Sequence, residues 1–205
     1  MNNQILQEAN TKEQRIFEWI RRVPITLWLF LIVLLTYCYT ASLSGNFLVM
    51  NLDVIEFFGA SARALSQGQF WVIFTSIFVH QDILHLALNS FSLVVIGLVL
   101  EKAGGRTNFL FVFFLAALFT MGLSVLIFPM WVFVGTSAGI FGLAGATIMR
   151  QLRSVIFSAL FILVLFAFTP PLSFLAHGIG AVVGVVADQV MIRSNSPNNR
   201  VAIFH

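Results

Sequence analysis

The sequence has few charged residues and a single cysteine. Only 9% of its 205 residues are charged, with eight acidic and eleven basic side chains, whereas 59% are hydrophobic. A soluble domain has about 25% charged and about 45–50% apolar residues. This composition therefore excludes an ordinary soluble enzyme and a disordered chain. The lone Cys38 excludes an internal disulfide, and we expect it to be a small packed or lipid-facing side chain.

The formal net charge is +3, but no basic stripe with interleaved aromatic residues is present. Nucleic acid is therefore excluded as a partner. Residues 1–22 are polar and mix both charge signs, and the apolar run that follows has the length of a membrane span. No small-residue cleavage site follows that run, so we expect a retained span rather than a signal peptide. Ile16, Phe17, Trp19 and Ile20 fit a short amphipathic helix on the membrane surface.

Apolar runs predict six transmembrane helices, because a span needs about 20 mainly apolar residues. They are predicted at residues 24–43, 83–100, 108–130, 137–149, 154–169 and 172–192. Pro170 and Pro171 suit the start of the last of these helices. Residues 44–82 are too polar to span, and their aromatic side chains favour a folded loop at the membrane interface. These aromatics are Phe57, Phe58, Phe70, Trp71 and Phe74.

The positions of the basic residues support this count. Ten of the eleven bases lie in segments 1–23, 101–107, 150–153 and 193–205, and only Arg63 lies elsewhere. The positive-inside rule then places both termini in the cytoplasm. We predict an all-α membrane protein, a six-helix bundle over residues 24–192 between cytoplasmic segments 1–23 and 193–205. The sequence makes no prediction of oligomeric state.

Four polar residues in the predicted spans fall at one depth, in the outer half of the bilayer. They are His85, Asn89, Ser137 and His177, and they come from three different helices. Ser137 with His177 offers a nucleophile and a general base. Asn89, His85 and the backbone N–H of Ser137 offer donors to an oxyanion. No carboxylate shares this layer, which favours a Ser–His dyad over a triad. The alternative is a set of hydrogen-bonded pairs that only holds the bundle together.

Two further polar residues in the spans have structural interpretations. Asp188 is predicted to lie at the cytoplasmic end of the last span, paired with Arg193. Ser90 is expected to bond its own helix backbone.

Glycines mark two of the predicted helices. Gly135, Ser137 and Gly139 form a G-x-S-x-G pattern, but the nucleophile elbow of that form needs a preceding strand. We instead expect Gly135 to give a tight entry into its helix. Gly180 and Gly184 form G-x-x-x-G, which lets membrane helices approach closely. Such packing of the fourth and sixth predicted helices would bring Ser137 toward His177.

Taken together, these motifs resemble the rhomboid family of intramembrane serine proteases, over about residues 69–185. The matching segments are Gln69-Phe70-Trp71, His80 with His85 and Asn89, Glu101 with Gly105, Gly135-Thr136-Ser137, and Ala176-His177 with Gly180 and Gly184. Several motifs in the family's order are far more specific than any one alone.

The resemblance implies a role for each residue. Ser137 would be the nucleophile, His177 its general base, and His85 with Asn89 part of the oxyanion hole. His80 and Trp71 would support the first loop, and Phe141 would pack near His177. Two departures stand out. Val72 replaces the family's usual loop arginine, which bears on loop stability, and Ala138 replaces a frequent glycine.

We therefore expect a serine endopeptidase that cleaves membrane proteins in or next to their transmembrane segments, within the lipid bilayer. No metal or cofactor is expected, because no carboxylate or cysteine shares a layer with the histidines. One alternative is a catalytically silent rhomboid-like protein that binds membrane clients. Another alternative is a small transporter or channel. The absence of an inverted repeat from the sequence argues against it. We expect a bacterial inner membrane, with the site opening to its outer face.

Overall fold

The computed structural model describes residues 23–150 and 171–195, and every named element in these ranges is a helix. Strand pairing there is limited to two isolated bridges, Val49 with Asp82 and Ala60 with Phe133. The predicted all-α class is thus confirmed for the described residues. The helices are α2 (Ile25–Ser44), α3 (Leu52–Phe58), α4 (Ala62–Ser66), α5 (Val72–Thr75), α6 (Ile83–Ile127), α7 (Ser137–Arg150) and α9 (Pro171–Ser194).

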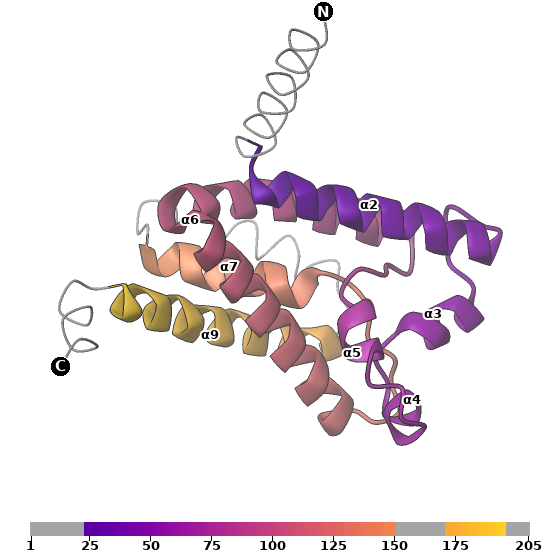
Figure 1. Ribbon diagram of the computed structural model, residues 1–205. Coiled ribbons are helices and arrows are strands. Elements are labelled where there is room, and N and C mark those ends of the chain that lie inside the picture. The colour runs from indigo at the N-terminus through magenta and orange to yellow at the C-terminus, as the bar shows by residue number, and fades with distance from the viewer. Residues whose placement is uncertain (1–22, 151–170, 196–205) are drawn as a thin grey trace, which may run out of the picture.

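Helix α6 consists of two helical segments that meet at a kink, and these correspond to the second and third predicted spans. It turns at Gly105, whose φ of 80° is left-handed and favours glycine. Each segment is about 33 Å long at about 1.5 Å per residue, enough to cross a bilayer core of about 30 Å. The first segment lies along α2, and the second crosses α7 and α9 diagonally (Figure 1).

The N-terminus of α2 is held by a carboxylate from α6. Glu101 accepts hydrogen bonds from the backbone N–H groups of Ile25 and Thr26, at 2.8 and 2.9 Å, and from the Thr26 hydroxyl at 2.7 Å. Arg106 lies 3.4 Å from the same carboxylate. The first N–H groups of a helix lack partners within it, so Glu101 caps α2 from 76 residues away.

Three described helices are long and apolar enough to cross a membrane: α2, α6 and residues 175–194 of α9. Five of the six predicted spans coincide with described helical segments, although the third ends at Ile127 rather than at residue 130. The remaining predicted span, 154–169, lies outside the described residues, as does the predicted surface helix within 1–22. Helix α7 is described over Ser137–Arg150, up to the last described residue before 171.

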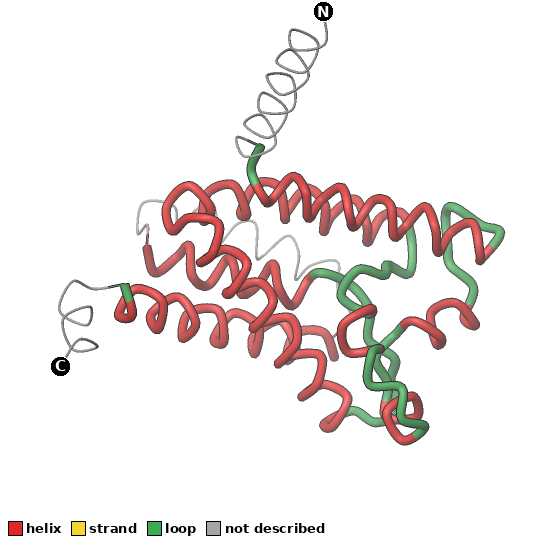
Figure 2. The backbone as a smooth tube through the Cα atoms, in the orientation of Figure 1, coloured by secondary structure: helices red, strands yellow, loops and turns green. Residues whose placement is uncertain are grey.

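The polar stretch 44–82, for which the sequence predicts a folded interfacial loop, contains three short helices, α3 to α5. Asn51 and Ser61 cap α3 and α4 by accepting from Val54 and Ala64 N–H groups. The stretch is tied to the bundle where the Ala60 and Phe133 backbones exchange two hydrogen bonds of 2.9 Å. These short helices and loops collect at the end of the bundle where α7 and α9 begin (Figure 2). Phe57, Phe70, Trp71 and Phe74 are all at least half exposed there.

Candidate active site

Helices α7 and α9 run parallel and lie in close contact (Figure 1). A Cβ added to Gly180 would lie 2.6 Å from the carbonyl oxygen of Ala138. A Cβ on Gly184 would overlap the backbone of Gly142. The predicted close approach of the fourth and sixth spans is therefore confirmed, and it depends on glycine at the contact.

Ser137 is the first residue of α7, and its side chain is half-buried. The carbonyl of Thr136 accepts the first helical hydrogen bond, from Ile140 N–H at 3.1 Å. The N–H groups of this first turn have no partner within the helix, and the dipole there favours negative charge. Ser137 therefore lies where a developing oxyanion would be stabilised.

His177 lies in the second turn of α9 and is 4% exposed. The ring of Phe141 stacks on its imidazole, with 4.2 Å between centroids and 16° between planes. Phe141 is four residues after Ser137, and residues at that spacing share a helix face. The stack therefore brings His177 beside the turn of α7 that carries Ser137.

His85 and Asn89 occupy the first two turns of α6, which begins at an Asp82 cap. The Asn89 amide nitrogen donates to the His85 carbonyl at 2.9 Å. Among the described residues, His85 Nδ1 and Asn89 Oδ1 are buried polar atoms without a hydrogen-bond partner. Helix α6 is in contact with both α7 and α9, and the His85 ring near its N-terminus lies against the backbone at Gly135.

Gly135 joins this group through its backbone. It has a φ of 116°, and its N–H donates to the Ser76 carbonyl at 2.8 Å. A Cβ there would lie 2.8 Å from Cε1 and 2.9 Å from Nε2 of His85. The edge of the His85 ring therefore lies against the backbone just before Ser137, and only glycine fits between them.

His80 is completely buried in the loop before α6. Its Nδ1 lies 3.2 Å from the Phe78 carbonyl and its Nε2 lies 3.3 Å from the Thr136 hydroxyl. Burial lowers the pKa of His80 well below its usual 6.5, and His85 nearby lowers it further. A neutral ring has one donor nitrogen, and a carbonyl only accepts. Nδ1–H therefore donates to Phe78, and Nε2 accepts from Thr136, the residue before Ser137.

The contact between Thr136 and His80 was not predicted from the sequence, where Thr136 was noted only as the residue before Ser137 in the serine motif. The available signal was a hydroxyl next to the candidate nucleophile. Val72 is the loop position at which the sequence analysis expects the family to have an arginine. Val72 is completely buried at the start of α5, while Trp71 beside it is 55% exposed. The loop here is packed on an apolar side chain instead of being held by an arginine.

Two structural interpretations of polar residues were wrong. Ser90 Oγ is buried without a hydrogen-bond partner among the described residues, so it does not bond its own helix. Asp188 is completely buried, and its charged partner is Arg150 of α7 rather than Arg193. Within residues 23–150 and 171–195, no group of three or more His, Cys, Asp or Glu residues is arranged to hold a metal ion.

Comparison with known proteins identifies the family. The model of the Rhomboid domain matches residues 67–194, more than half of the chain. The chain is 33% identical over 119 residues to Rhomboid-like protease 3 of Toxoplasma gondii, covering 58% of this chain and 45% of that protein. It is 29% identical over 149 residues to Rhomboid protease GluP of Bacillus subtilis, covering 72% of this chain and 28% of that protein. The chain thus spans less than half the length of these relatives. With its helices and motif residues arranged as described, the chain belongs to the rhomboid family.

Proposed function

We propose that this protein is an intramembrane serine endopeptidase that uses Ser137 as nucleophile and His177 as general base. The observation that carries this proposal is the stacking of Phe141 on His177, one turn after Ser137. This stack joins α7, which carries the Ser137 hydroxyl, to α9 close to the His177 imidazole. The protease names of the relatives support the same reaction class.

In the proposed reaction, His177 takes the proton from the Ser137 hydroxyl as the oxygen attacks a substrate carbonyl. The leaving amine takes that proton, and water then hydrolyses the acyl-enzyme. The Ser137 backbone N–H, His85 and Asn89 would stabilise the oxyanion. The second N–H of the Asn89 amide remains for this role, since the first is used by the His85 carbonyl.

The proposed substrates are membrane proteins cleaved in or next to a transmembrane segment. A helical segment hides its scissile bond, because its backbone is internally hydrogen-bonded. Helix-breaking or small residues near the bond should therefore favour cleavage. The proposal includes a six-helix domain over residues 24–192 with cytoplasmic termini and a site that opens to the outer face. The basic residues support that orientation. A bacterial inner membrane stays a prediction from the sequence.

The test is labelling of the purified protein in detergent by a tagged fluorophosphonate, which reacts with activated serines. Wild type is expected to label, and Ser137→Ala and His177→Ala are expected not to. Ser66→Ala, at an exposed position of α4, and His205→Ala, outside the family match, serve as controls that keep labelling. Circular dichroism and a monodisperse elution profile establish that each variant is folded.

Cleavage of a tagged membrane substrate by wild type, but not by Ser137→Ala, would complete the case. A folded wild type without labelling would contradict the protease proposal. It would favour the client-binding alternative, in which Ser137→Ala still captures its clients.

A further inference from the structure

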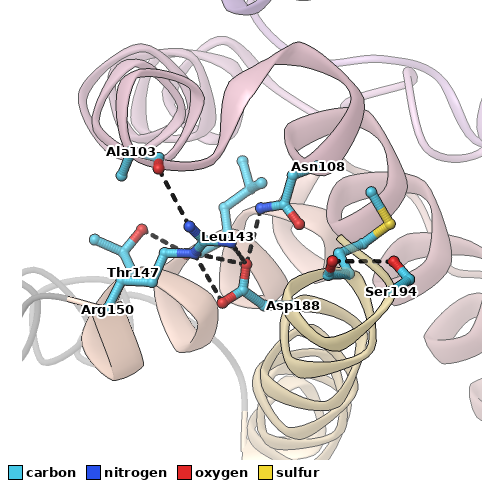
Figure 3. Close-up of polar contacts among 8 residues, drawn as sticks. Ala103, Asn108, Leu143, Thr147, Arg150, Asp188 and Ser194 are labelled. Carbon is cyan, nitrogen blue, oxygen red and sulfur yellow. Dashed lines mark hydrogen bonds and ion pairs between the residues drawn. The ribbon is translucent and has the colours of Figure 1, made fainter. Parts of the chain in front are cut away.

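A buried charged cluster lies at the opposite end of α7 and α9 from Ser137 (Figure 3). Arg150 Nε donates to both carboxylate oxygens of Asp188, at 2.8 and 2.9 Å, and Nη2 lies 2.8 Å from Oδ1. The Asn108 amide donates to the same oxygen at 2.8 Å. Arg150 Nη1 donates to the Ala103 carbonyl at 3.2 Å. The cluster therefore joins α7 and α9 to both segments of α6, around the turn at Gly105.

A charge in this position requires an explanation. The Asp188 side chain is 0% exposed and that of Arg150 is 19% exposed. Removing two charges from water costs free energy that their attraction often only offsets, so such a pair adds little net stability. Its best attested benefit is specificity, because one arrangement of the helices satisfies the pair and others leave a charge buried and unpaired.

The contact between α7 and α9 is made largely of small residues. Small residues face each other along it, with Ala138 against Gly180, and Gly145 against Ala181. Small side chains that pack closely resist sliding along the axis less than large interlocking ones do, so directional contacts matter more for the register. Directional contacts exist at the two ends, the Phe141–His177 stack at one and the Arg150–Asp188 pair at the other.

Both ends belong to one parallel register. Arg150 is 13 residues after Ser137, about 20 Å along α7, and Asp188 is 11 residues after His177, about 17 Å along α9. A slip of one residue would move one helix by about 1.5 Å and rotate its side chains by about 100°. The paired hydrogen bonds of a planar guanidinium cannot follow such a shift.

We propose that Arg150 and Asp188 are positioning residues, which set the register of α7 against α9 and through it the placement of Ser137 relative to His177. This inference rests on the proposed function for its effect on activity. The register itself is a property of the two helices and is measured independently of activity.

The experiment compares the double variant Arg150→Met/Asp188→Leu with wild type. Apolar residues of similar volume remove the pair without leaving a buried charge, so the double variant is expected to stay folded, with a thermal midpoint near that of wild type. The expected result is a fall in kcat of about 100-fold with KM little changed, since a misplacement of about 1 Å can cost that much. Thr147→Val, on the same helix, is the matched control and keeps wild-type kcat.

Register is measured by pulsed electron paramagnetic resonance, in a Cys38→Ser background. Spin labels at Met149 and Leu175 occupy exposed positions on α7 and α9, with about 20 Å between them along the axis. Wild type is expected to give one narrow distance distribution, and the double variant a shifted or broadened one. Arg150→Lys keeps the positive charge but loses the paired hydrogen bonds of the guanidinium. Its distance distribution and its kcat should be intermediate between those of wild type and the double variant.

The proposal is overturned if the double variant keeps the wild-type distance distribution, whether or not activity falls. It is also overturned if the distribution changes and kcat does not. If wild type neither labels nor cleaves, the proposed function fails, and the distance distribution alone decides whether the pair sets the register.

Discussion

The ring of Phe141 lies nearly flat on the imidazole of His177, at 4.2 Å and 16°. Phe141 is 1% exposed, so its own orientation is fixed by the packing of α7. The flat ring of Phe141 restricts rotation of the His177 imidazole. It therefore fixes the directions in which the two imidazole nitrogens point. The stack therefore determines where the proposed base can receive a proton.

Replacing Phe141 by leucine should remove this restriction. Aromatic pairs contribute about 0.5–1.5 kcal/mol beyond their buried area, which corresponds to a fall of about 2–10-fold in the rate of fluorophosphonate labelling. Phe141→Tyr keeps the ring and should keep the rate. Equal labelling rates for the leucine variant and wild type, at equal thermal midpoints, would show that the stack does not orient His177.

The glycine contact between α7 and α9 predicts a contrast between two positions on α9. An alanine at Gly184 would overlap the backbone of Gly142, whereas an alanine at Gly178 meets nothing within 4 Å. We expect Gly184→Ala to lower the thermal midpoint in detergent and to abolish labelling. Gly178→Ala should be neutral or stabilising by about 0.5–1 kcal/mol, as alanine favours helix. If Gly184→Ala kept the wild-type thermal midpoint and labelling, α7 and α9 could move apart without loss of stability.

The burial of Val72 predicts that arginine, which the resemblance to the family implies at this loop position, cannot replace it without cost in this chain. Its side chain is completely buried at the start of α5, so Val72→Arg would place a charge in an apolar site or expel the segment. We expect a lower thermal midpoint and weaker labelling. Ile73→Arg, at a half-buried position beside it, tests the effect of an added charge and should cost less. Higher stability of Val72→Arg would indicate that the loop has kept room for the arginine.

His80 predicts that the protein loses stability in acid. Its pKa in the folded state is lowered, first by burial and then by His85, so below about pH 6.5 the unfolded chain binds a proton that the folded chain does not. The stabilisation is fully present above that pH and declines toward the folded-state pKa, by up to about 1.4 kcal/mol per pH unit. Thermal midpoints between pH 7.5 and 5 should fall less steeply for His80→Gln, whose amide can still bond Thr136 and Phe78. Identical slopes would exclude His80 as the titrating group.

Apolar runs located the long helices well, because membrane helices of about 20 residues leave a strong signal in one sequence. The predicted connection between the second and third spans, residues 101–107, agrees with the kink of α6 at Gly105. The sequence did not reveal what the Glu101 side chain binds. In the structure Glu101 is used to cap α2, and only Gly105 leaves the helical conformation.

The interactions between helices were harder to predict. The partner of Asp188 depends on the rotation and register of α7 against α9, and hydropathy does not specify either one. Arg193 was favoured because it is close in sequence, whereas Arg150 is 38 residues away. The proposed site residues were found because serine, histidine and asparagine are rare at the depth of a span and carry chemistry. The contact of Thr136 was missed because a hydroxyl beside the candidate nucleophile does not by itself indicate its partner.

The carboxylate that caps α2 has a consequence for biosynthesis. Glu101 is made 76 residues after Ile25, about 4–15 s later at ordinary rates of chain growth. During that interval the first turn of α2 has to satisfy its N–H groups with water or lipid headgroups, because hydrocarbon offers no acceptor. Helix α2 can therefore form early, but its first turn gains the acceptor supplied by Glu101 only when α6 arrives beside it. Insertion of this protein should accordingly proceed by helix pairs, with a newly inserted α2 still free to adjust until Glu101 leaves the ribosome.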